Sequence, residues 1–182
     1  MENSSVINRA IEMLPLLTNY ISAVAKKPPA SKCFKQVSEA LKDNMLAAKL
    51  GFLQSVAMQL EPFLTQYQTN VPMLPFLYND LYTLLRNLML RFIKTDIMVT
   101  VTNAAKLVEV DVSKKANHKT LSSIDIGFAA SAVCKNAQGV EVLQFKEECR
   151  DFLQHMCAKL AVMPIAIQVS QGCNMFRPRS HA

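Results

Sequence analysis

The sequence predicts an all-α fold, an irregular bundle of about five to seven amphipathic helices. Only 4 of the 182 residues are glycine, whereas sandwiches and barrels need many glycine-rich turns. Apolar residues recur every three or four positions in several segments, which is the spacing of one helix face. Hydrophobic residues make up 51% and charged residues 19% of the chain, a balance typical of a globular protein. We therefore expect one helical domain over residues 1–162 and a poorly ordered tail over 163–182, where the pattern is lost.

The first two predicted helices lie before residue 42. The first covers residues 6–24 and has polar side chains opposite its apolar face. Pro15 removes a backbone donor inside it, so we expect a kink or a break there. Two lysines and two prolines at residues 26–29 end this segment, and Ser31 is suited to cap a second helix that reaches about Leu41.

The next two predicted helices carry leucine stripes. One covers residues 46–64, with Pro62 near its end, and the other covers residues 74–92. The second stripe is the clearest in the chain and consists of Leu74, Leu77, Leu81, Leu84, Leu85, Leu88, Met89 and Phe92. It lacks the sustained heptads of a coiled coil, so the stripe predicts a buried helix side.

The segment of residues 97–112 fits two patterns. Its β-branched, partly alternating residues are compatible with a short hairpin that turns near residues 102–105. A helix over residues 95–108 is the alternative. Beyond Gly139 the last helix has an inner face of Val142, Phe145, Cys149, Phe152, Leu153, Met156 and Leu160.

Charge suggests a polyanionic partner. Lysine and arginine exceed acidic residues by 20 to 14, which gives a net charge of +6 and a pI near 9.1. The candidate nucleic-acid contacts are Arg86, Arg91 and Lys94 around the end of the fourth helix, and Lys114, Lys115 and Lys119, with His118, in the polar loop of residues 113–120. An ordinary solvated surface is the alternative interpretation of these cations.

No catalytic or cofactor motif is present. The sequence contains no P-loop, GxGxxG, HExxH or GxSxG pattern. Cys149, His155 and Cys157 lack the paired spacing of a zinc site, and the two cysteines are expected to be small buried apolar residues. Glu109, Asp111 and Asp125 do not form a convincing triad for two-metal chemistry. We therefore expect no enzyme activity, no catalytic residue, no metal, no cofactor and no small-molecule substrate.

The five cysteines suggest an intracellular protein. Their number is odd and their spacing irregular, unlike a secreted disulfide framework. The N-terminus shows no signal peptide, and no apolar run is long enough for a membrane span. We expect reduced thiols, a nuclear or cytoplasmic location and no membrane partner.

Residues 49–70 and 72–81 resemble vertebrate hAT-type transposase-like proteins. Shorter pieces at 111–112, 124–128, 142–145 and 148–150 are similar to the same family. Residues 10–20 resemble the family's helix that follows a conserved tryptophan, which this chain does not contain. The resemblance covers most of residues 5–160 and consists of helical patterns without catalytic signatures.

The resemblance implies a position within a larger architecture. Members of the hAT family have an RNase H-like catalytic fold interrupted by a large helical insertion, with two catalytic aspartates before the insertion and a glutamate after it. This chain matches the helical middle alone, so no catalytic residue is carried over to it. An all-helical insertion also favours helix for residues 95–108.

Three functions are expected, two from the resemblance and the third from the basic residues. The first is a non-catalytic remnant of a domesticated or decayed transposase, acting as a protein or DNA interaction module. The second is a fragment of a DNA-transposing enzyme whose catalytic strands lie outside this chain. The third is an independent basic DNA-binding regulator. The expected partners are a second copy, a related transposase-like protein or DNA, and self-association is expected because apolar faces would remain uncovered.

Overall fold

A computed structural model describes residues 2–68, 70, 73–137 and 139–172, with side chains left undescribed at 2, 3, 74, 75 and 163–172. The all-α prediction is confirmed, and the described part contains eight α-helices, one more than the largest number expected. The elements are α1 (Glu2–Ala23), α2 (Lys32–Ala40), α3 (Leu46–Gln66), α4 (Leu74–Leu90), α5 (Thr95–Thr100), α6 (Ala104–Glu109), η1 (Lys115–Asn117), η2 (Leu121–Ser123), α7 (Phe128–Cys134) and α8 (Gly139–Gly172), where η marks a 3-10 helix. None of the helices in the described residues is both long and apolar enough to cross a bilayer.

The chain forms two compact units where the sequence analysis expected one domain. Unit 1 consists of Met1–Gln68 and Ile124–Cys149, and unit 2 consists of Thr69–Ser123 and Arg150–Ala182. Each unit joins two segments that are distant in the sequence. Periodicity along one segment reports which side of a helix is buried, but it does not report which distant segment covers that side, so it could not reveal this division.

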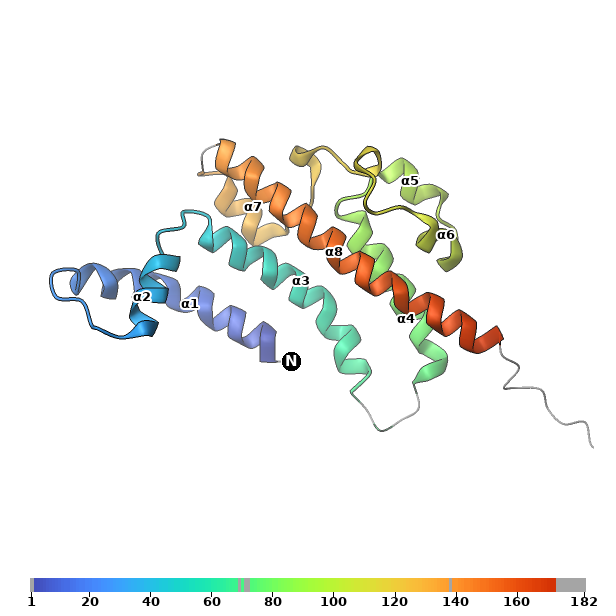
Figure 1. Cartoon of the computed structure of the whole chain (residues 1–182), viewed down its shortest axis with the longest axis horizontal. Helices are drawn as coiled ribbons and strands as arrows, with labels where there is room; N and C mark the ends of the chain where they lie inside the picture. The colour runs from blue at the N-terminus through green and yellow to red at the C-terminus, as the bar shows by residue number, and fades with distance from the viewer. Residues whose placement is uncertain (1, 69, 71–72, 138, 173–182) are drawn as a thin grey trace, which may run out of the picture. The chain divides into compact units, whose positions relative to one another are not determined.

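In unit 1, α3 lies between α1 and α7 (Figure 1). The buried face of α3 holds Ala48, Gly51, Phe52 and Val56, at the spacing of one helix side. The Phe52 ring meets Phe145 edge to face, with ring centroids 6.4 Å apart. This geometry is favoured by the quadrupoles of the two rings and joins α3 to the first turns of α8.

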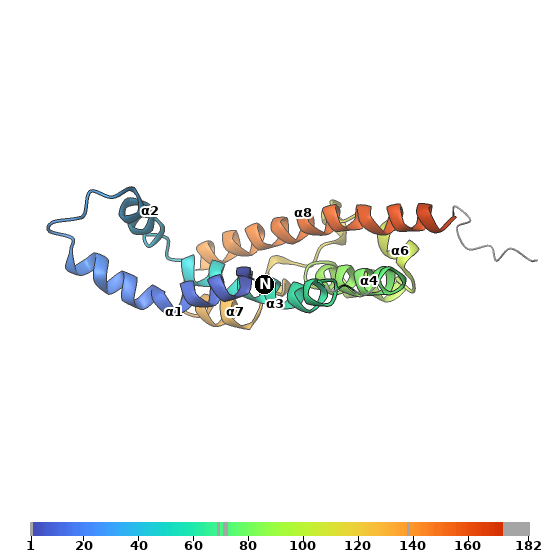
Figure 2. The ribbon, with the colours of Figure 1, turned by 90° about the horizontal axis from the view of Figure 1, so that it is seen from below.

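The helices α1 and α2 form a hairpin at the start of unit 1, and Figure 2 shows α2 beside the C-terminal half of α1. The expected cap of α2 is confirmed, because the Ser31 hydroxyl accepts the backbone N–H of Phe34 at 3.1 Å. The break expected at Pro15 does not occur, since α1 continues through it. Because proline has no N–H, one backbone carbonyl in the preceding turn of α1 lacks its helical hydrogen-bond donor. Pro15 is exposed, so this carbonyl lies on a side of α1 that water can reach.

In unit 2, the leucine stripe of α4 is the core. Six of the eight predicted residues are no more than 6% exposed, which confirms the buried side for Leu81, Leu84, Leu85, Leu88, Met89 and Phe92. Leu77 is half-buried, and the side chain of Leu74 lies outside the described part. The helix α4 packs against α6. The segment of residues 95–109 is helical, so the hairpin alternative is wrong, but it forms two short helices, α5 and α6, separated at residues 101–103 where one helix over residues 95–108 was expected. Asn103 starts α6 by accepting the backbone N–H of Lys106 at 2.9 Å, a local bond that competes with strand pairing.

The expected tail boundary at residue 162 is not where the last helix ends. The backbone of α8 remains helical to Gly172, and residues 173–182 lie outside the described part of the chain. The amphipathic pattern stops near Ala161, but a helical backbone does not require an amphipathic pattern to continue. Loss of periodicity was therefore a poor marker of the end of this helix.

Candidate functional site

All six predicted nucleic-acid contacts lie in unit 2, but in different surroundings. Arg91 is only 6% exposed, and Arg86 and Lys119 are half-buried. Lys94, Lys114 and Lys115 are exposed. The structure therefore does not gather the six residues into one exposed basic surface, and DNA contact by the exposed ones stays a prediction.

Two of the predicted cations hold the loop of residues 113–120 to the end of α4. Lys119 Nζ donates to the carbonyl oxygen of Leu90 at 2.6 Å, and Lys94 Nζ donates to that of Ala116 at 2.7 Å. Leu90 is the last residue of α4, where carbonyl groups lack helical donors and a positive charge is favoured. Lys94 and Lys119 thus already have a structural role.

Backbone bonds fix the same loop. The N–H of Lys94 donates to Asn117 at 2.9 Å, and the N–H of Lys119 donates to Phe92 at 2.8 Å. These two bonds flank an isolated antiparallel β-bridge, which Ile93 forms with His118. This attachment places the one clearly basic loop of the sequence beside the end of α4.

His118 is inside unit 2, at 5% exposure, and is not on the surface. Its Nε2 lies 2.8 Å from the carbonyl oxygen of Val112, so Nε2 carries the hydrogen. Its Nδ1 has no hydrogen-bond partner within the described part of the molecule. The imidazole packs edge-on against Phe92 with ring centroids 5.5 Å apart, so it supports the loop and cannot reach a phosphate.

A hollow of about 520 Å³ lies next to this loop and includes Lys106, a cation that the sequence analysis did not select. Its charged lining consists of Lys106, Glu109, Asp111 and Lys114. The Ser113 hydroxyl and N–H donate to Asp111 and keep the pKa of that carboxyl below its usual value. Two cations thus face two carboxylates, so the hollow is nearly neutral and is poorly suited to a polyanion.

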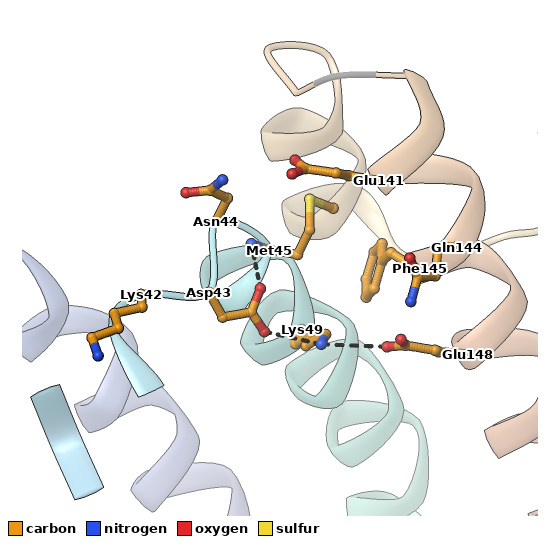
Figure 3. A pocket seen from close by; sticks show the side chains of 9 residues that line it. All are labelled: Lys42, Asp43, Asn44, Met45, Lys49, Glu141, Gln144, Phe145 and Glu148. Atoms are coloured by element: carbon orange, nitrogen blue, oxygen red, sulfur yellow. Dashed lines mark hydrogen bonds and ion pairs between the residues drawn. The ribbon is translucent and has the colours of Figure 1, made fainter. Parts of the chain in front are cut away.

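Unit 1 contains a second hollow of about 250 Å³ beside the first turn of α3 (Figure 3). Lys49 lies between two carboxylates, with Nζ 2.9 Å from Asp43 and 3.4 Å from Glu148. Asp43 also accepts the N–H of Met45 at 2.8 Å, just before α3 begins. The remaining lining residues are Lys42, Asn44, Glu141, Gln144 and Phe145.

The ion pairs around Lys49 stabilise the junction of α3 with α8. The hydrogen bond to Asp43 raises the pKa of Lys49, and the same bond lowers the pKa of Asp43. Both groups are therefore charged at neutral pH, so Lys49 is a poor general base and Asp43 a poor general acid. The sequence analysis missed this pairing, because Glu148 is distant from Lys49 in the sequence and Asp43 lies outside the helix that carries Lys49.

We expect Lys49→Met to remove a pH-dependent part of the stability. The lowered pKa of Asp43 contributes stability above about pH 4, the pKa of an unfolded aspartate, and this contribution is lost as pH falls through the lower folded value. Because the Lys49 and Asp43 side chains are each 39% exposed, we expect a loss of at most about 1 kcal/mol at pH 7 and a smaller loss at pH 2.

The measurement is urea denaturation of wild type and variant across this pH range, with an NMR titration of the Asp43 carboxyl. Lys42→Met is the matched control, since the Lys42 and Glu39 side chains are 69% and 74% exposed. It should leave the stability nearly unchanged. A Lys49→Met loss that is the same at pH 2 and pH 7 would contradict the electrostatic origin.

Burial disfavours nucleophilic and metal chemistry at Cys149 and Cys157. Cys149 and Cys157 are 2% and 0% exposed, which confirms the expectation that they are buried. Burial raises the pKa of Cys157 to about 12, so its thiolate is scarce at neutral pH. Burial also raises the pKa of Cys134. Within the residues that the structure describes, no group of three or more histidine, cysteine or acidic side chains has the arrangement to hold a metal ion.

The acidic residues weighed for two-metal chemistry have local roles. Asp111 closes the turn at Ser113, and Asp125 accepts the N–H of Gly127 at 2.9 Å just before α7. Gly127 has a φ of 84°, which favours glycine at this position. Asp111 and Asp125 belong to different units, so the geometry within either unit does not bring them together.

Comparison of the chain with protein-family models, with curated proteins and with solved structures finds no match. The resemblance to hAT-type proteins therefore depends on the sequence segments that carry it.

Proposed function

We propose that this chain is a non-catalytic helical module of the hAT transposase-like kind and that it works by binding another protein. One observation carries the proposal: no side chain between residues 4 and 44 is buried, although this stretch includes all but the first two residues of α1 and the whole of α2. The apolar residues Leu16 and Tyr20 of α1 are 60% and 51% exposed.

A helical hairpin with this much uncovered apolar surface is characteristic of an interface. Short helices are marginal in water on their own, and most of their stability comes from burying an apolar face. Contiguous apolar surface that the chain does not cover usually marks a site where another protein binds. A related transposase-like protein in the nucleus is the partner that the resemblance suggests.

The absence of catalysis is part of the same proposal. It is supported by the local roles of Asp111 and Asp125 and by the raised pKa of Cys157. A group that already satisfies a turn, or that is buried in its neutral form, is not poised for proton transfer or nucleophilic attack.

We expect Leu16→Gln to weaken capture of a specific protein partner by about fivefold or more, a change of roughly 1 kcal/mol. The full chain and the variant are immobilised, exposed to nuclease-treated cell extract, and compared by quantitative mass spectrometry. Val99→Gln is the matched control, because Val99 is 71% exposed and lies in unit 2. If no captured protein distinguishes Leu16→Gln from Val99→Gln, the hairpin is not the binding surface and the proposal is wrong.

DNA binding is the second candidate, favoured by the exposure of Lys114 and Lys115 on one loop. The same experiment separates the two candidates. The capture is repeated with untreated extract, and binding that appears only there, and that is weakened by Lys114→Ala with Lys115→Ala but not by Leu16→Gln, would favour a DNA-binding role over protein binding.

A further inference from the structure

An apolar groove of about 250 Å³ lies between α1 and α2. Its apolar lining includes Leu17, Tyr20 and Ile21 of α1 and Cys33, Phe34 and Val37 of α2. We call these six residues the α1–α2 groove. The Tyr20 and Phe34 rings meet edge to face, with centroids 6.3 Å apart, and connect the two helices.

The size of the groove suits side chains of a partner more than a free small molecule. Pockets for drug-sized ligands usually enclose about 300–1,000 Å³, more than this groove holds. A helix laid along two other helices inserts a few apolar side chains, spaced three or four residues apart, into such a groove. Because α1 and α2 are themselves helices, this is the natural way for them to complete a bundle.

The charge of the segment that forms the groove indicates which helix would fit. Residues 13–38, which include both sides of the groove, contain four lysines and no acidic residue. The lysines are Lys26, Lys27, Lys32 and Lys35, all exposed and without an ion pair to any residue that the structure describes. The nearest acidic residues on either side, Glu12 and Glu39, already pair with Arg9 and Lys42.

A second copy of the chain is poorly matched to this surface. Two such grooves brought together would place four lysines of each copy near four of the other, and like charges oppose association. A partner with acidic residues beside its apolar ones instead meets complementary charge. Such attraction acts over roughly 8 Å at physiological salt, so it does not require direct contact between the charges.

Building on the proposed function, we propose that the α1–α2 groove binds an acidic amphipathic helix of a partner protein, with apolar side chains in the groove and carboxylates attracted by the positive charge of residues 26–35. Cys33 offers a variant that tests the groove without disturbing the fold. It lines the groove and is exposed, at the second residue of α2. A glutamate there is favoured by the helix dipole, so Cys33→Glu should fold while placing a carboxylate in the groove.

Gln36→Glu is the matched control. Gln36 is exposed on the same helix and does not line the groove. The two variants therefore have the same net charge and differ in where the carboxylate lies. A long-range electrostatic effect would affect both equally, whereas a helix seated in the groove is affected mainly by Cys33→Glu.

The experiment uses the full 182-residue chain and a labelled synthetic helical peptide of about five turns, with leucines on one face and glutamates elsewhere. A twin peptide has lysine in place of each glutamate. By fluorescence anisotropy we expect the acidic peptide to bind, and the basic twin to bind about tenfold more weakly or not at all. Cys33→Glu should weaken acidic-peptide binding by about tenfold, and Gln36→Glu by no more than about threefold.

Several outcomes would overturn the inference. Equal binding of both peptides, or equal loss with Cys33→Glu and Gln36→Glu, would show that the groove does not select an acidic helix. Binding to phosphatidylserine vesicles without peptide binding would assign the surface to a membrane. Light scattering that shows a dimer abolished by Cys33→Glu would assign it to a second copy. A captured partner that depends on Leu16 but not on Cys33 would reject this groove while leaving the proposed function intact.

Discussion

Replacing Gly51 with valine is expected to destabilise the protein by roughly 2–3 kcal/mol. Gly51 is a buried residue of α3 that packs against α7. A Cβ atom at this position would lie 2.9 Å from the backbone nitrogen of Ala130 and 3.1 Å from the Cβ of Ala129. The first contact involves the backbone of a helix, which cannot rotate aside as a flexible side chain does. Valine would therefore separate α3 from α7, and its better helix propensity, a few tenths of a kcal/mol over glycine, cannot offset that cost.

Gly139→Val is the control for the Gly51 prediction. Gly139 is the first residue of α8, and a Cβ there would meet no atom within 4 Å. Its replacement should change the stability by no more than about 0.5 kcal/mol. Urea denaturation followed by circular dichroism measures both variants. Equal stability of Gly51→Val and wild type would show that the close approach of α3 and α7 is absent in solution.

The helices are predictable from the sequence where their signals are local. Ser31 caps α2 through a hydrogen bond to a residue three positions away, and such a bond depends on nothing distant. The buried side of α4 is also predictable, because leucines spaced three and four residues apart lie on one face of the helix. This holds whichever element packs against that face. The choice of helix over hairpin for residues 95–112 is decided by Asn103, an N-cap residue that the hairpin interpretation placed in a turn.

The candidate basic site was less predictable, because cations near a helix end do not follow the angular spacing of the helix. Arg91 was expected to be exposed on α4, but α4 ends at Leu90 and the residue beyond it is buried. Lys119 is distant from α4 in the sequence, yet its ammonium group satisfies the Leu90 carbonyl. Periodicity could not predict either placement, since both depend on how the chain folds back on the end of a helix.

The last helix shows a second limit of periodicity. Phe145, Cys149, Leu153 and Cys157 are buried at four-residue spacing, whereas Phe152, expected on the inner face, is 42% exposed. At about 100° per residue, each four-residue step turns the buried face by about 40°. The positions of the buried residues therefore turn gradually around α8. A single apolar stripe drawn on a helical wheel cannot represent such a change.

The sequence predicts the charge of the segment that forms the α1–α2 groove but not the groove itself. The four lysines without an acidic neighbour between residues 13 and 38 can be read directly. The groove itself depends on the turn that brings α2 back onto α1, so that Tyr20 meets Phe34. The charge is therefore a property of the sequence, whereas the apolar groove is a property of the fold.

Phe92→Ala is expected to have the largest effect on stability, a loss of about 3–5 kcal/mol. Phe92 is fully buried just beyond α4, and its ring packs edge-on against the His118 imidazole. Its carbonyl accepts the N–H of Lys119, so the residue supports the loop of residues 113–120 through both its side chain and its backbone. Alanine would leave a cavity beside a buried imidazole whose Nδ1 has no partner within the described residues. The loop would then lose the surface on which it packs.

Two measurements separate the loss of packing between Phe92 and the loop of residues 113–120 from a general loss of hydrophobicity. Phe128→Ala is the same substitution at a side chain that is 90% exposed, and it should change the stability by no more than about 0.5 kcal/mol. Native-state hydrogen exchange should show weaker protection of the Lys94 and Lys119 amides in Phe92→Ala. These amides donate the two backbone hydrogen bonds that attach the loop of residues 113–120 to the chain segment after α4. If Phe92→Ala leaves both amides as protected as in wild type, the loop is held by its backbone bonds alone. The exposed positions of Lys114 and Lys115 would then not depend on the Phe92–His118 contact.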